Sequence, residues 1–289
     1  MTFHNELGTV SVVIPTLNRC SLLQRAIQSV LNQSYNPHEI IVIDNGSSDD
    51  TKKTIQTLYP NIRYLTENKI GVSAARNKGI KNARFEWIAF LDSDDVWKPE
   101  KLEKQLILNY EFKNKYRFIH TNEIWFRNGV FLNQMKKHEK SGGNLFNKCL
   151  KLCCISPSSS LIKKKIFDEH GFFDEDLKVC EDYDMWLRLT SKENVGYVSQ
   201  PLVVKYGGHS DQLSQKYWGM DRFRIQSIEK NIKNNCFSKD QNKLAYEMLI
   251  KKLKVVITGA NKRSNNEIFE IYSNKLSSWL SVSDSFLYD

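Results

Sequence analysis

Short apolar runs alternate with amphipathic segments over the first 125 residues, and this alternation restricts the fold more than any other feature. Runs rich in Val, Ile, Leu and aromatic residues indicate buried strands. They are Val10–Ile14, Glu39–Ile43, Ile62–Leu65 and Glu86–Leu91, with helical spacing of apolar residues over 21–32, 49–58 and 72–82. Strands this apolar are buried on both faces, so the pattern predicts an α/β fold with a mostly parallel sheet flanked by helices.

A different pattern follows these residues. Residues 117–121 and 124–126 are strand-like, and Asn128–Gly129 after them is a hairpin signal. From about Ser214 onward the sequence predicts mostly helix. We therefore predict a domain over residues 1–213 and a helical C-terminal extension over residues 214–289. We expect this domain to divide into two halves, residues 8–125 and residues 126–213.

The chain is basic, with a net charge of +9, and has no apolar run of the roughly 18–20 residues that a membrane span needs. Residues 1–8 lack the apolar core of a signal peptide, so we expect a cytoplasmic protein. No nucleic-acid-binding motif accompanies the charge, so we expect no nucleic-acid partner. Lys251, Lys252 and Lys254 lie in an amphipathic segment. This predicts peripheral contact with an anionic membrane, or a helix packed on its own protein with a solvated basic face.

The six cysteines show no paired Cys-x-x-Cys spacing. Cys149, Cys153 and Cys154 cluster, but no neighbouring histidine completes a zinc site. Because free cysteine is among the most buried residue types, we expect these three side chains to be small buried hydrophobic groups.

The acidic sequence Asp92–Ser93–Asp94–Asp95 directly follows the apolar run that ends at Leu91. Clustered carboxylates raise one another's pKa, and a bound divalent cation removes that cost. Mg²⁺ prefers carboxylate oxygens and often bridges them to phosphate. In open α/β sheets, ligands bind beyond the carboxyl ends of the strands. The motif therefore indicates a metal–phosphate site, with an acidic loop that caps the next helix as the alternative.

Three further motifs lie at strand ends or helix starts. Pro15–Arg19 follows the first strand, and Asp44 ends the second, where it either accepts a hydrogen bond from a base or caps a turn. Arg76 lies one turn into a predicted helix and within reach of a phosphate or base. Glu181–Asp182 opens a helix, where carboxylates favour the helix dipole or supply a general base. No dinucleotide-binding or P-loop glycine motif occurs.

Together these motifs resemble those of the family 2 glycosyltransferases, over about residues 8–210. The resemblance is carried by Val12–Arg19, Val42–Asp49, Ala74–Asn77, Phe90–Asp95 and Glu181–Asp184. It implies the Rossmann-like GT-A fold and an inverting enzyme of the hexosyltransferase type. The donor would be a nucleoside diphosphate sugar, with UDP-sugars the most common. The acceptor would be a saccharide or lipid-linked saccharide hydroxyl in bacterial surface polysaccharide synthesis.

The resemblance also implies that residues 8–125 are the nucleotide-sugar-binding half and residues 126–213 the acceptor and catalytic half, and it implies a role for each matching position. The residues expected to bind the nucleotide sugar are Pro15, Thr16, Asn18, Arg19, Asp44, Arg76, Asp92 and Ser93. Asp94 is expected to bind Mg²⁺ or Mn²⁺, with His209 close to the metal, although Gly207–Gly208 replaces an arginine-containing stretch that is common there. Asp182 is expected to be the catalytic base, with Glu181 beside it.

Two other classes of protein explain part of the pattern. Asp92 and Asp94 also resemble the motif of haloacid dehalogenase-type phosphatases, with Asp92 as nucleophile. That motif normally follows the first strand of its domain, whereas here it follows the fourth, and the motifs at Pro15 and Asp44 would have no role. A non-catalytic sugar-nucleotide-binding protein of the same fold is the second alternative, and the presence of both Asp94 and Asp182 argues against it.

Overall fold

The computed structural model of the protein describes residues 7–208 and 216–282. Nine strands form one sheet in the order β3-β2-β1-β4-β8-β6-β9-β5, and β7 pairs with β6 beside this path. The strands are β1 (Val10–Thr16), β2 (Glu39–Asp44), β3 (Arg63–Thr66), β4 (Trp87–Phe90), β5 (Val96–Trp97), β6 (Phe118–Arg127), β7 (Val130–Leu132), β8 (Ser160–Lys163) and β9 (Val195–Gly207). Pairing is parallel from β3 to β4 and mixed beyond β4, within the predicted α/β fold.

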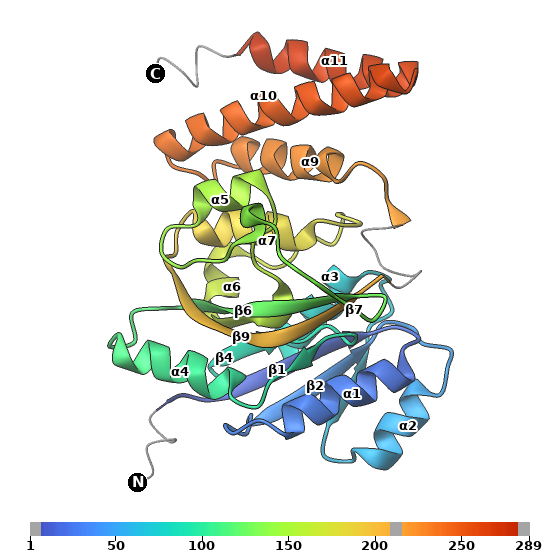
Figure 1. Cartoon of the computed structure of the whole chain (residues 1–289), viewed down its shortest axis with the longest axis vertical. Helices are drawn as coiled ribbons and strands as arrows, with labels where there is room; N and C mark the ends of the chain where they lie inside the picture. Colours follow the sequence, from blue (N-terminus) through green and yellow to red (C-terminus); the bar gives the residue numbers. More distant parts are fainter. Residues whose placement is uncertain (1–6, 209–215, 283–289) are drawn as a thin grey trace.

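Helices cover both faces of this sheet (Figure 1). Their bounds are α1 (Cys20–Leu31), α2 (Thr51–Leu58), α3 (Val72–Asn82), α4 (Lys101–Glu111), α5 (Phe146–Lys151), α6 (Lys165–His170), α7 (Glu181–Thr190), α9 (Met220–Lys233), α10 (Lys239–Lys262) and α11 (Asn266–Leu280). Helices α1, α2 and α4 share one apolar core with the sheet. Helices α3, α5, α6 and α7 share a second core on the other face.

Alternate residues of the central strands belong to different cores, because successive side chains of a strand point to opposite faces. Val12 and Ile14 of β1 pack in the core with α1, whereas Val13 packs in the core with α3. All three are fully buried. Because both faces of the strand are buried, its sequence does not alternate between apolar and polar residues.

Helix α3 lies very close to β1 because residue 79 is a glycine. A Cβ atom at Gly79 would lie 2.2 Å from Cγ1 of Val13, far inside van der Waals contact. This close packing holds α3, and with it Arg76, beside the carboxyl ends of the parallel strands.

Strand β1 continues through Pro15 to Thr16, whereas the sequence suggested that proline ends it. The carbonyl of Val13 accepts from the Leu91 amide on the β4 side, and Pro15, two residues on, presents its nitrogen to the same side. β4 pairs with β1 only as far as Val13 and Phe90. No ladder hydrogen bond is lost, so the strand tolerates the proline.

Helices α9, α10 and α11 lie within the region predicted to be a helical C-terminal extension and stack at one end of the molecule (Figure 1). Ile228 of α9 and Leu253 of α10 belong to the same core as Trp186 of α7. The extension is therefore continuous with the core of the sheet domain. The predicted boundary at residues 213 and 214 lies outside the described residues.

The predicted basic face of the extension is only partly correct. Lys252 is buried, and its Nζ donates to Asp221 at 2.9 Å and to the Lys151 carbonyl at 3.1 Å. Helical spacing places it among the buried residues of α10, whereas Lys251 and Lys254 are exposed. Among the helices of the described chain, none is both long and apolar enough to cross a bilayer.

Candidate active site

The carboxyl ends of β1, β2 and β4 meet at one edge of the sheet. Thr16 lies in register with Asp44, and the acidic loop begins where β4 ends. The structure thereby brings together three motifs that are far apart in the sequence. These are Pro15–Arg19, the residues after Asp44, and Asp92–Asp95.

Asn18 joins the first two of these motifs. Its backbone has a φ of 51°, a left-handed conformation that asparagine tolerates better than most residues. Its amide donates to Oγ of Ser47 at 2.8 Å, and its Oδ1 accepts from the Ser48 amide at 2.7 Å. The two loops are therefore fixed to each other.

Asp44 is buried at the tip of β2. One carboxylate oxygen accepts from the Ser47 amide at 2.9 Å, and the other accepts from the Tyr64 hydroxyl. Burial, and then this carboxylate, raise the pKa of Tyr64 well above its ordinary value, so its hydroxyl remains a donor. Nearby, the Thr16 hydroxyl is buried without a hydrogen-bond partner among the described residues, as expected for a group that a ligand would complete.

Two arginines neutralise the acidic loop. A guanidinium nitrogen of Arg19 lies 2.8 Å from Oδ2 of Asp94. Arg76, only 3% exposed, lies 2.7 Å from Asp92 and 2.6 Å from Glu181. Arg76 therefore connects the acidic loop after β4 with the first turn of α7, where Glu181 lies 105 residues after Arg76 in the sequence.

Burial and these ion pairs have opposite effects on the carboxylates. Burial by itself would raise the pKa of Asp92, but the Arg76 guanidinium outweighs it and the pKa is lowered. For Glu181, burial and then the neighbouring Asp182 raise the pKa to about 7. Asp92 is therefore ionised at neutral pH, while Glu181 is close to its protonation midpoint.

Asp95 is a third carboxylate of the loop, to which the sequence assigned no role. It is 1% exposed and accepts from Oγ of Ser158 at 2.6 Å and from the Tyr206 amide at 3.3 Å. Burial raises its pKa to about 8, although Lys205, with Nζ 3.8 Å away, opposes the shift. Asp95 thus anchors the loop to β9. The sheet topology that creates this contact has no local sequence signal.

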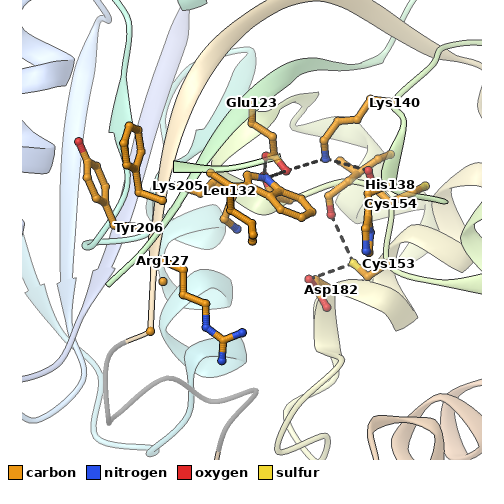
Figure 2. Close-up of a pocket in the computed structure, with 16 residues that line it drawn as sticks. Glu123, Arg127, Leu132, His138, Lys140, Cys153, Cys154, Asp182, Lys205 and Tyr206 are labelled. Carbon is orange, nitrogen blue, oxygen red and sulfur yellow. Dashed lines mark hydrogen bonds and ion pairs between the residues drawn. The ribbon is translucent and has the colours of Figure 1, made fainter. Parts of the chain in front are cut away.

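A cavity of about 460 Å³ lies beside the start of α7 (Figure 2). Its walls come from β6, the end of β9, residues 153–156 and Asp182. Figure 2 shows Asp182 and Tyr206 on opposite sides of this space. A predicted catalytic residue thus lines a cavity large enough for a sugar.

Asp182 is held in place by two donors. Its Oδ2 accepts from Sγ of Cys153 at 3.1 Å, and its Oδ1 accepts from the Tyr183 amide at 2.7 Å. Burial and then Asp182 raise the pKa of Cys153 well above its ordinary value, so Cys153 remains a thiol donor. The sequence prediction for the cysteines is correct for the buried Cys149 and Cys154 and wrong for Cys153, because α7 brings a polar partner to it.

The floor of the cavity contains an ion pair that the sequence analysis missed. Nζ of Lys140 lies 2.7 Å from Glu123, and both side chains are almost fully buried. Burial alone would raise the pKa of Glu123, but Lys140 outweighs it and lowers the pKa to about 2. Trp125 donates its indole N–H to the same carboxylate at 3.1 Å. Glu123, the one carboxylate of strand β6, was the available signal.

Ser93 and His209 are two further residues that the sequence predicts to belong to the site. Ser93 is buried within the acidic loop. His209, predicted to lie near the metal, falls outside the described residues. The structure therefore does not place His209 relative to Asp94.

The hard oxygen donors of Asp92 and Asp94 fit the coordination that Mg²⁺ and Mn²⁺ prefer. Glu169, His170 and Glu193 form a second cluster of possible metal ligands, whose two carboxylates both pair with Arg117, at 2.6 and 3.1 Å. That cluster shares no residue with the strand-end motifs.

Comparison with known proteins gives consistent results. Residues 11–171 match the family model for glycosyl transferase family 2. An uncharacterized glycosyltransferase of Rickettsia felis is 35% identical over 201 residues, which are 67% of this chain and 32% of that protein. The chain thus spans about a third of the length of such Rickettsia relatives.

A second relative matches over most of its own length. The UDP-Glc:alpha-D-GlcNAc-diphosphoundecaprenol beta-1,3-glucosyltransferase WfgD of Escherichia coli is 31% identical over 74% of this chain and 81% of its own. The crystal structure of S. aureus TarS in complex with UDP-GlcNAc has a TM-score of 0.63 and 17% identity, over 93% of this chain and 92% of that one. That likeness shows the fold. The family match and the length of the E. coli alignment show that the chain belongs to glycosyl transferase family 2.

Proposed function

We propose that this glycosyltransferase moves a sugar, with inversion, from a UDP-sugar to a hydroxyl of a saccharide or lipid-linked saccharide in bacterial surface polysaccharide synthesis. The observation that carries the proposal is the pair of contacts from Arg76 to Asp92 and to Glu181. They hold the acidic loop, suited to a diphosphate, next to the helix whose Asp182 lines a cavity. The names of the E. coli relative and of the TarS complex support the UDP donor.

The nucleotide would lie against the joined loops at the ends of β1 and β2. Pro15, Thr16, Asn18 and Asp44 would line the base pocket, and the unpartnered Thr16 hydroxyl supplies a free polar atom there. Arg76 and Asp92, with Ser93, would face the ribose. Arg19 would contribute positive charge beside the diphosphate.

Asp94 would hold Mg²⁺ or Mn²⁺, and His209 is proposed as a further neighbour of the metal. A bound divalent cation acts as a Lewis acid that offsets the negative charge developing on the departing nucleoside diphosphate. The chain itself already places the Arg19 cation against Asp94, at 2.8 Å. Binding of a cation would therefore compete with the Arg19 contact or share the carboxylate with it.

Asp182 would remove the proton from the acceptor hydroxyl as that oxygen attacks the sugar. A carboxylate that lines the cavity can reach a bound acceptor, and the two donors that hold it fix its direction. Glu181 would act through Arg76, whose position it determines. A single displacement from the opposite face inverts the anomeric centre, and holding both substrates in line supplies much of the acceleration.

The proposed location is the cytoplasm, with peripheral contact at the inner face of the membrane. The exposed Lys251 and Lys254 of α10 keep the basic extension as one proposed contact surface. A lipid-linked acceptor can reach Asp182 only if the cavity itself approaches the bilayer. Contact between the bilayer and the lysines of α10 does not by itself bring the acceptor to Asp182.

A thermal-shift screen of UDP-, dTDP- and GDP-sugars, with and without Mg²⁺ or Mn²⁺, tests the donor and metal assignments. Ligand at about 100 times its Kd stabilises the fold by about 2.7 kcal/mol. We expect a UDP-sugar to raise Tm, and chelator or Asp94→Ala to remove the shift. An equal shift under all conditions would contradict the metal assignment, and no shift with any UDP-sugar would contradict the donor. Release of inorganic phosphate without acceptor would support the phosphatase alternative.

A further inference from the structure

The hairpin of β6 and β7 carries an unusual group of exposed apolar side chains. Val130, Phe131, Leu132 and Met135 are 69%, 55%, 44% and 57% exposed. A single exposed apolar residue needs no explanation, but several on one projecting element indicate a contact surface.

The hairpin is held firmly at its base. Asn128 and Gly129 have φ values of 50° and 76°, the left-handed conformations of a tight two-residue turn. Phe131 packs edge-on against Phe126, with ring centres 6.0 Å apart, and Phe126 stacks on Tyr206. The exposed side chains are therefore presented by an ordered hairpin.

Positive charge surrounds these apolar side chains. Arg127 precedes the turn, Lys136 and Lys137 follow β7, and all three are exposed. Among the carboxylates of the described ranges 7–208 and 216–282, none forms an ion pair with them. An apolar group with flanking cations matches an anionic bilayer, whose interface takes up apolar side chains while its headgroups attract lysine and arginine. A protein partner would not require this combination.

The hairpin is also continuous with the cavity. Arg127 and Leu132 both line it, and Figure 2 shows them between Tyr206 and Asp182. By contrast, α10 and α11 lie beyond α9, away from the sheet (Figure 1). Contact through the hairpin would place the cavity at a membrane surface. Contact through α11 would instead leave the C-terminal extension between the cavity and the membrane.

We propose that the β6–β7 hairpin, residues 127–137, docks on an anionic lipid bilayer. Val130, Phe131 and Met135 enter the interface between headgroups and acyl chains, and Arg127, Lys136 and Lys137 contact lipid phosphates. Docking through the hairpin thereby places the cavity next to the bilayer. That this cavity then receives a lipid-linked saccharide rests on the proposed function.

Flotation of the protein with phosphatidylcholine vesicles, with and without phosphatidylglycerol, tests the docking surface. The wild type should bind the anionic vesicles, and more weakly at high salt. Val130→Ser with Phe131→Ser should lower partitioning at least about tenfold through lost apolar burial. Lys136→Gln with Lys137→Gln should lower it by about fivefold per lysine. The matched control, Lys251→Gln with Lys254→Gln, makes the same charge change on α10 and should lower partitioning less than the hairpin lysine variant does.

Phe131→Trp gives a direct readout of insertion. Its emission should shift to the blue on addition of anionic vesicles and be quenched by brominated acyl chains. Unchanged emission, wild-type binding by the hairpin variants, or an equal loss in the α10 control would overturn the proposal. The proposal would also be overturned if the protein bound no vesicles but formed a dimer that the serine variants dissociate. The hairpin would then contact a second copy of the chain.

The assay contains no donor or acceptor, so its outcome is separate from that of the proposed function. Val130 and Phe131 do not line the cavity. Their serine variant should therefore keep the thermal shift with the UDP-sugar. Loss of vesicle binding with a normal donor shift supports the docking surface, and a missing donor shift in the wild type counts against the proposed function alone.

Discussion

At the scale of single residues, Asp182 can be tested as a base separately from its place in the fold. Asp182→Asn keeps the shape of the side chain and an Oδ1 that can accept from the Tyr183 amide, but it cannot take up the acceptor proton. We expect transfer to fall by about 10²–10⁴-fold, with Tm and donor affinity close to wild type. Calorimetry and a transfer assay on one preparation measure all three. Near-normal transfer would refute the assignment.

Cys153 is expected to position that base. Its thiol donates to Oδ2 of Asp182 at 3.1 Å and so fixes the direction of that carboxylate. Cys153→Ala removes the donor, so kcat should fall while donor affinity stays close to wild type. Cys153→Ser restores a donor and should recover most of the lost kcat. An unchanged kcat in Cys153→Ala, with only Tm altered, would leave Cys153 a packing role.

At the scale of elements, the contact between α3 and β1 depends on the absence of a side chain at residue 79. Gly79→Ala gains about 1 kcal/mol in helix propensity. The new methyl group would meet Val13, so we expect a net loss of about 1–3 kcal/mol in the free energy of unfolding. Urea denaturation measures it. Adding Val13→Ala should cost less than the sum of the two single changes, and a stabilised Gly79→Ala would disprove the close approach.

The second half of the sheet was harder to predict than the first. The sequence suggested two strand-like runs over residues 117–126, whereas the structure has one strand, β6, with a register shift against β9 near Asn122. An irregularity of this kind depends on the partner strand, which is remote in sequence. The Asn128–Gly129 turn was predicted correctly because its backbone preference is local.

At the scale of the whole molecule, the sheet domain and the extension should unfold together. Asp184 of α7 is fully buried and accepts from Ser227 and Asn231 of α9, at 2.9 and 3.0 Å. Lys230 pairs with it at 2.7 Å. Separating α9 from α7 would leave Asp184 only its contact with Arg188 of α7, at 3.1 Å, and would expose their common core, at a cost of several kcal/mol.

We therefore expect one calorimetric transition, with equal calorimetric and van't Hoff enthalpies. Far-ultraviolet circular dichroism should give the same midpoint as the fluorescence of the buried Trp186. Two separate transitions, or an extension that melts first, would show that the common core does not couple the two parts.

The sequence by itself determined what local chemistry can encode. Strand and helix periods gave the parallel half of the sheet, and the polar motifs at strand ends gave the edge where Pro15, Asp44 and Asp92 meet. The order of these motifs identified the family. The assigned roles of individual residues, including the metal at Asp94 and the base at Asp182, stay predictions.

Only the tertiary structure decided which distant groups pair. Arg76 with Glu181, Lys140 with Glu123, and Lys252 with Asp221 are each set by how elements pack. A charged residue in an amphipathic helix has the same local sequence whether its face meets water or a neighbour, so Lys252 could not be recognised as buried. Ion pairs of this kind exist because desolvated charges must find partners, and the partner becomes available only when the chain has folded.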